Sequence, residues 1–175
     1  MKKTILGIVT KSPWPKGRRG SREKQDWYQT CIDAVCWKKV VQNAQIVVPC
    51  ATQPTDGQRE VEYYVQAVKE LGGEIEAIDE GYETVAQIKI FGRLARERKS
   101  DLILFTTFTH YPRIAWICWW NKIPVKKLVV AWGIPRPREA CTDLVLIFLY
   151  PMLDVLGLMD WFITKVINRR LEGKL

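Results

Sequence analysis

Five short apolar segments, each followed by a segment with helical periodicity, constrain the fold of this chain more than any other feature. The apolar segments are typical of buried strands, because they are short, rich in β-branched residues and bounded by polar residues, Gly or Pro. They cover residues 4–10, 44–50, 74–79, 101–107 and 125–132. The helical segments cover residues 23–41, 58–73, 83–99, about 110–122 and 139 to the end, where Pro151 predicts a kink.

This alternation predicts an α/β fold, a Rossmann-like doubly wound sheet of about five parallel strands with helices on both faces. Parallel strands need helical crossovers, and those crossovers are right-handed. A length of 175 residues fits one domain. We expect residues 1–140 to form the Rossmann-like body and residues 141–175 to form C-terminal helices packed on the same domain.

The formal net charge of +8 is distributed unevenly along the chain. Residues 1–30 and 91–175 have an excess of Lys and Arg, whereas residues 31–90 carry ten acidic residues against five basic ones. A basic face is typical of proteins that bind an anionic small molecule, an anionic lipid or a nucleic acid. Charge that serves only solubility explains the same pattern equally well.

The cysteines and the apolar segments bear on the cellular location. The five cysteines form no CxxC pair and no Cys/His cluster, so reduced thiols fit better than a metal site or disulfides. The apolar stretch 144–158 is short and is interrupted by Pro151 and Asp154, which makes it a poor candidate for a membrane span. We therefore expect a cytoplasmic protein that is at most peripheral to a membrane.

The loops at the two edges of the predicted sheet differ in composition. Connections from a helix into the next strand are short and plain, whereas connections from a strand into the next helix are long and rich in polar residues. The latter read KSPWPKGRRGSR, ATQPTDGQRE, EGYET, FTHYPR and GIPRPRE. In a parallel sheet these five loops gather at the carboxyl edge, where open α/β sheets bind ligands. The sequence therefore predicts a site at that edge.

The fourth of these loops contains the only histidine of the chain, His110, and Arg113 three residues later. Thr107 or Thr109 is suited to cap the following helix, and Pro112 suits its first turn. A cation near a helix N-terminus is unfavourable unless an anion lies beside it. That anion is either a ligand or a carboxylate of the protein.

Two interpretations of His110 follow. In the first, His110 acts as a general acid or base because its ordinary pKa lies near neutrality, and Glu60 or Asp79 orients it. In the second, His110 and Arg113 belong to an internal network with a carboxylate from a neighbouring loop.

Other loops supply further candidates for ligand binding. Arg18 and Arg19 lie among glycines in the first loop, a composition that suits an anion but lacks the spacing of a phosphate-binding motif. Arg136 lies in the last loop. Glu83, Thr84 and Gln87 begin the third helical segment, and Thr84 and Gln87 share a helix face there.

The order of these motifs resembles the ElyC/SanA/YdcF-like family, a Rossmann-like domain of unknown function. Glu60 in REVEYYVQAVKELGG matches the glutamate that opens a helix in the family. The segment DEGYETVAQ resembles its threonine motif, with Glu83 and Gln87 at positions where Asn is common. TTFTHYPRI matches its His-x-x-Arg motif through His110 and Arg113. The likeness covers roughly residues 4 to 140.

The resemblance implies a polar cleft lined by these residues and a link to cell-envelope processes. It also implies a nucleotide-like or S-adenosylmethionine-like ligand. The first loop here departs from the family's glycine-rich pattern, and the membrane-spanning N-terminus of some members has no counterpart in this sequence.

Two functions from different classes fit the sequence. The first is a protein that binds, and as an enzyme acts on, an anionic or nucleotide-like small molecule at the sheet edge. The second is a non-catalytic basic module that binds a membrane surface or a nucleic acid. Nucleic acid is the weaker partner, because aromatic residues interleaved with Lys and Arg are missing. The C-terminal helices are compatible with a homodimer interface.

Overall fold

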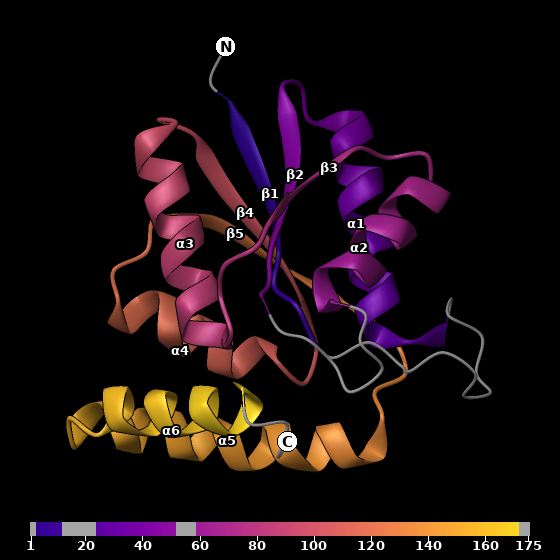
Figure 1. The fold of residues 1–175 in the computed structure, drawn as a ribbon. Coiled ribbons are helices and arrows are strands. Elements are labelled where there is room, and N and C mark those ends of the chain that lie inside the picture. Colours follow the sequence, from indigo (N-terminus) through magenta and orange to yellow (C-terminus); the bar gives the residue numbers. More distant parts are fainter. Residues whose placement is uncertain (1–2, 12–23, 52–58, 172–175) are drawn as a thin grey trace.

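The computed structural model describes residues 3–11, 24–51 and 59–171. Within these ranges five parallel strands form one sheet in the order β3-β2-β1-β4-β5 (Figure 1). The strands are β1 (Thr4–Ile8), β2 (Ala44–Pro49), β3 (Ile75–Ile78), β4 (Asp101–Thr107) and β5 (Val125–Ala131). All five residues of β1 are buried, as expected for a central strand that is covered on both faces.

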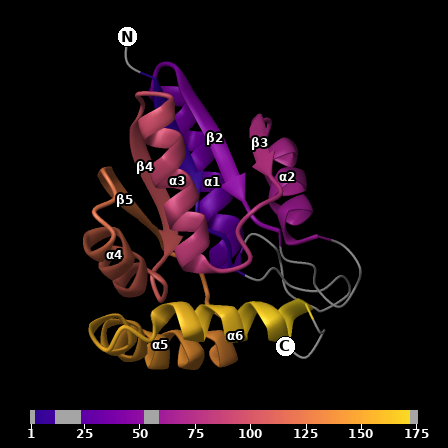
Figure 2. The same cartoon turned by 60° about the vertical axis from the view of Figure 1, so that its left-hand side comes forward.

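Helices cover both faces of the sheet, and a helical hairpin lies across one of its edges. The helices are α1 (Asp26–Val40), α2 (Glu60–Glu70), α3 (Thr84–Glu97), α4 (Tyr111–Trp120), α5 (Pro137–Val155) and α6 (Met159–Leu171). One core cluster joins α1 and α2 to the sheet, and the other joins α3, α4 and the hairpin to its opposite face. Figures 1 and 2 show α5 and α6 lying across the carboxyl ends of the strands.

The predicted fold class is confirmed, and the five strands fall within two residues of the predicted bounds. The sequence pattern succeeds because each crossover helix has one apolar face directed at a strand that is itself apolar. In α3, for example, Val85, Ile88 and Phe91 are all buried.

One local prediction is corrected, and one is refined. Helix α5 includes Pro151 and continues to Val155, and the helical segment is interrupted at Gly157, whose φ of 68° suits a residue without a side chain. The N-cap of α4 is His110 and not Thr107 or Thr109. The hydroxyl of Thr109 instead donates a hydrogen bond to Asp143 on α5.

The strand order reverses between β1 and β4, which are hydrogen-bonded neighbours in the sheet. The chain runs outward from β1 to β2 and β3 on one side, then crosses back to β4 and continues to β5 on the other. Loops at the carboxyl ends of β1 and β4 therefore diverge and leave a crevice between them.

No helix in the described part of the chain combines the length and the apolar character that crossing a membrane requires.

Candidate functional site

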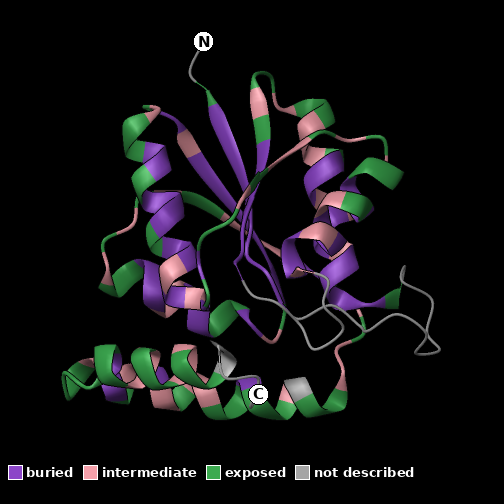
Figure 3. Ribbon diagram, in the orientation of Figure 1, coloured by how far each residue is buried: buried purple, intermediate pink, exposed green. Residues whose placement is uncertain are grey.

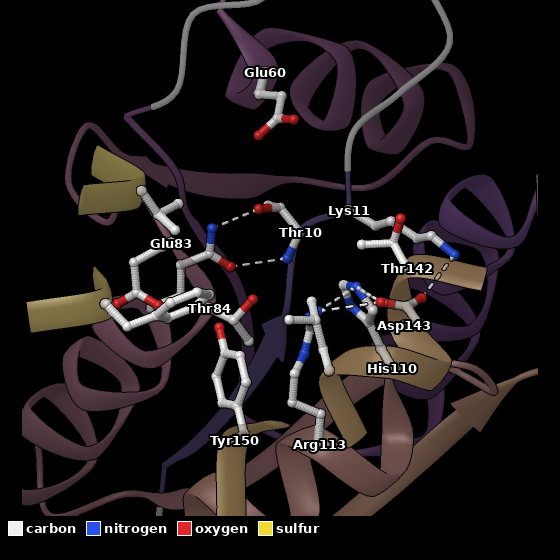
Figure 4. A pocket seen from close by; sticks show the side chains of 14 residues that line it. Thr10, Lys11, Glu60, Glu83, Thr84, His110, Arg113, Thr142, Asp143 and Tyr150 are labelled. Atoms are coloured by element: carbon white, nitrogen blue, oxygen red, sulfur yellow. Dashed lines mark hydrogen bonds and ion pairs between the residues drawn. The ribbon is translucent and has the colours of Figure 1, made fainter. Parts of the chain in front are cut away.

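A cavity of about 220 Å³ lies at the carboxyl ends of β1 and β4, where the strand order reverses (Figure 4). Loops and helix starts from the sheet supply its polar wall, and the hairpin of α5 and α6 supplies much of its apolar wall. Its lining residues are Thr10, Lys11, Glu60, Glu83, Thr84, Gln87, His110, Arg113, Thr142, Asp143, Leu146, Tyr150, Phe162 and Val166.

The segment after β1 is held to helix α3 by two hydrogen bonds. The backbone N–H of Thr10 donates to Oε1 of Gln87 over 3.1 Å, and Nε2 of Gln87 donates to Oγ1 of Thr10 over 2.6 Å. Glu83 is the N-cap residue of α3, so the helix begins at Thr84 and Gln87 lies at the end of its first turn. The Glu83 carboxylate accepts hydrogen bonds from the backbone N–H groups of Val85 and Ala86.

Lys11 connects three elements through a buried ion-pair network. Its ammonium lies 2.6 Å from Oδ2 of Asp26, the first residue of α1, and 3.4 Å from Oδ2 of Asp143 on α5. It also donates to Oγ1 of Thr109 over 3.1 Å. Because both carboxylates are buried, this cation is largely neutralised within the protein.

His110, Arg113 and Asp143 form a second buried cluster next to this network. The Nη2 atom of Arg113 lies 2.6 Å from Nε2 of His110 and 3.4 Å from Oδ1 of Asp143. Nε2 of His110 is itself 3.1 Å from the same carboxylate oxygen. The guanidinium carbon of Arg113 also lies 5.3 Å from the ring centroid of Tyr150. The carboxylate that compensates Arg113 near the helix N-terminus is therefore Asp143.

Burial and, to a smaller extent, the positive charge of Arg113 lower the pKa of His110 to about 4, although the carboxylate of Asp143 acts in the opposite direction. The imidazole is therefore neutral at pH 7. Burial disfavours ionisation of Asp143, but the positive charge of Arg113 and the hydrogen bond from Thr109 outweigh it, so the pKa of Asp143 lies below the ordinary value.

The neutral ring has one nitrogen with a proton and one with a lone pair. A guanidinium nitrogen can only donate, so we assign the lone pair to Nε2 on its shorter contact, 2.6 Å to Arg113; the 3.1 Å contact of Nε2 with the carboxylate of Asp143 would instead need the proton there. The proton is then on Nδ1. Nδ1 of His110 and Nε of Arg113 are both buried and have no hydrogen-bond partner among the described residues. Two buried N–H donors are thus left unpaired beside the cavity.

The structure brings most of the predicted site residues together. Of these, Glu60, Glu83, Thr84, Gln87, His110 and Arg113 all line the cavity. Glu60 is buried at the start of α2, where its Oε2 accepts a hydrogen bond from the Cys50 thiol over 3.0 Å. Glu83 is committed to capping α3, which gives it a structural role in addition to its place in the lining.

Two predicted residues lie elsewhere. Asp79 does not orient His110; it pairs with Arg59 over 2.7 Å on the surface, where the chain leaves β3 at the edge of the sheet. Arg136 occupies the N-cap position of α5, without a capping hydrogen bond from its side chain, and does not line the cavity. Arg18 and Arg19 lie outside the described residues.

The expectation that the pKa of His110 lies near neutrality is also wrong, because burial lowers it. A base with a pKa of about 4 accepts protons poorly at pH 7, so His110 is better suited to hydrogen bonding than to proton transfer.

Three residues of the cluster were missed from the sequence: Lys11, Asp143 and Tyr150. Lys11 directly follows the predicted first strand, and its position at the carboxyl edge is a signal that the sequence does contain. Asp143 and Tyr150 belong to α5, and nothing in the sequence indicates that this helix returns across the edge. Asp143 directly precedes the apolar stretch 144–158, and that position in the sequence does not predict a role at the edge of the sheet.

Among the side chains described, no group of three or more His, Cys, Asp or Glu residues is arranged to hold a metal ion. No known protein-family model matches this sequence, and the search of curated proteins gave no significant match. The resemblance to the ElyC/SanA/YdcF-like family therefore stays a prediction.

Proposed function

We propose that this protein binds an anionic or nucleotide-like small molecule in the cavity between the ends of β1 and β4. In this proposal His110 and Arg113 donate hydrogen bonds to acceptor oxygens of the ligand. The proposal includes membership of the ElyC/SanA/YdcF-like family, because the residues that carry the resemblance are residues of the cavity lining.

The observation that carries the proposal is the pair of unpaired donors on His110 and Arg113. A buried N–H group without a partner costs about 1–3 kcal/mol, and more when the group is charged. Two such groups, both on residues of the cavity lining, are costly unless a bound molecule supplies the acceptors. Both nitrogen atoms are covered in this structure, so binding requires a local shift of the lining that exposes them. Phosphate and carboxylate oxygens are the acceptors that an arginine prefers.

The charges around the cavity favour a ligand with donors as well as acceptors. Lys11 and Arg113 are each paired with a buried carboxylate, and Glu60 and Glu83 add negative charge to the lining. The electrostatic potential of such a cavity would therefore contribute little to the binding of a ligand that carries only negatively charged groups. A nucleoside monophosphate offers phosphate oxygens to His110 and Arg113 and hydroxyl donors to a carboxylate such as Glu60. A cavity of about 220 Å³ also favours a small ligand.

Calorimetric titration with three probes tests this proposal: adenosine 5′-monophosphate, adenosine and inorganic phosphate. We expect the monophosphate to bind most tightly, because it alone has both kinds of group. Substitution Arg113→Gln should weaken its binding by about 10- to 100-fold, the effect of losing a charged hydrogen bond. Circular dichroism would verify that the variant is folded.

Arg93→Gln is the matched control, because Arg93 is an exposed arginine that pairs with Glu80 away from the cavity. This control should bind the monophosphate like the parent. Equal binding by the parent and by Arg113→Gln, or no binding of any of the three probes, would contradict the proposal.

A further inference from the structure

Helix α5 is apolar on both of its faces, but only one face is covered by the described part of the chain. Its inner face packs on the domain through residues such as Tyr150 and Leu153, which are buried. Its outer face carries six large apolar side chains that are each more than half exposed: Leu144, Val145, Phe148, Met152, Val155 and Leu156. Figure 3 shows the hairpin as largely exposed. A helix that is apolar all round is normally buried all round.

The spacing of these residues indicates what covers them. The exposed residues Cys141, Val145, Phe148, Met152 and Val155 follow one another at intervals of four, three, four and three. This is the seam spacing of a helix that packs lengthwise against another helix. A lipid surface requires only an apolar stripe and does not impose that alternation.

Charge also favours a helical partner over a membrane. Helices that lie on membranes carry Lys and Arg along their polar face, but α5 contains no Lys or Arg after Arg138 in its first turn. Its two later aspartates are engaged within the chain, Asp143 with His110 and Asp154 with the indole N–H of Trp116. The outer face is therefore uncharged, which permits it to face a copy of itself.

We propose that a second copy of this chain covers this face, with the two α5 helices packed antiparallel about a two-fold axis. An axis beside residue 150 places Phe148 opposite Met152 of the second copy and Val145 opposite Val155. The same axis places Leu144 opposite Leu156. All six exposed residues then find an apolar partner, so the seam is self-complementary.

The exposed area is sufficient for a stable pair. With on the order of 100 Å² for each large side chain, the six residues approach the roughly 800 Å² that each partner contributes to a standard interface. Leu158, just before α6, and Trp161 in its first turn are also exposed and extend the patch. The pair would also hold α5 in place, and the opposite face of α5 supplies Asp143 and Tyr150 to the cavity.

Light scattering coupled to gel filtration tests the proposal, and we expect a mass twice the 20.3 kDa of the chain. Val155→Glu and Phe148→Glu should each give a monomer whose circular dichroism is unchanged. Val40→Glu is the matched control, because Val40 is the last residue of α1 and is as exposed as Val155 is at the end of α5. It should remain a dimer.

Cross-linking tests the register. In a background with the exposed Cys36 and Cys141 replaced by Ser, Val145→Cys/Val155→Cys should form disulfide-linked dimers on mild oxidation with copper phenanthroline. Val40→Cys/Val155→Cys should not. A monomeric parent at micromolar concentration would overturn the proposal. Flotation of that monomer with anionic phospholipid vesicles would then assign the face to a membrane.

Discussion

His110 shows how strongly burial changes the chemistry of a single side chain. Its position in a conspicuous loop motif suggested a catalytic acid or base, but in the folded protein its ring is buried between Arg113 and Asp143. Loss of water and the nearby guanidinium lower the pKa of His110 to about 4, so the ring is neutral. A neutral ring that accepts from Arg113 has a proton to donate on Nδ1, which suits it to the proposed hydrogen bond with a ligand.

The lowered pKa of His110 predicts how stability depends on pH. The folded chain keeps the ring neutral down to about pH 4, whereas the unfolded chain protonates it near pH 6.5. Between these values the unfolded state binds more protons, so the free energy of unfolding should fall as the pH falls from 6.5 towards 4. A shift of this size corresponds to roughly 3 kcal/mol over the whole window.

Urea denaturation of the parent and of His110→Gln at several pH values measures this effect. The variant should lose the part of the slope between pH 6.5 and 4. It should keep the decline below pH 4, where the unfolded chain protonates carboxylates such as Asp143, whose pKa is lower in the folded protein. Identical slopes for the two proteins in the upper window would show that His110 titrates normally.

At the scale of elements, the connections after the strands position the site. Gly133 follows β5 at the point where the chain passes α1, and a Cβ at this position would lie 2.4 Å from Cα of Asp26 and 2.7 Å from its N. The adjacent residues Gln25 and Ile134 form a parallel bridge. Because both contacts are with backbone atoms, no side-chain rearrangement can relieve them. This close approach sets the position of Asp26 and hence of its ion pair with Lys11.

Gly133→Ala should therefore destabilise the protein by about 1–3 kcal/mol, the usual cost of overpacking. Chemical denaturation measures the loss. Gly157→Ala is a useful comparison, because Gly157 has open space around its Cα and a φ of 68°, so only backbone strain of roughly 1 kcal/mol is expected there. If Gly133→Ala lowers the free energy of unfolding no more than Gly157→Ala does, the explanation by close backbone contact is contradicted.

The elements were predictable because their signals are local. Each strand is a short apolar run and each crossover helix has its own apolar face, so periodicity is enough to find them. The part of the site that belongs to these connections, Glu60, Thr84, Gln87, His110 and Arg113, was predictable for the same reason. Asp79 was misassigned because β3 lies at the edge of the sheet, separated from β4 by the two strands β2 and β1, and strand order is not a local property.

At the scale of the whole molecule, the hairpin of α5 and α6 decides the character of the site. Its sequence indicates apolar helices but does not indicate which surface they cover, since that depends on the direction in which the chain leaves β5. The hairpin closes the carboxyl edge of the sheet and brings Asp143 between Lys11, His110 and Arg113. In the proposed dimer the paired α5 helices would lie between the two cavities, one from each copy of the chain.

Nuclear magnetic resonance of the His110 ring nitrogens tests the central claim most directly, because the chain has only one histidine and its signals are unambiguous. At pH 7 the account predicts a neutral ring protonated at Nδ1. On addition of adenosine 5′-monophosphate, the Nδ1 signal should shift in a saturable manner and the pKa of His110 should rise from about 4, because a bound anion favours the imidazolium. A neutral ring protonated at Nε2, or signals unchanged at high ligand concentration, would contradict the account.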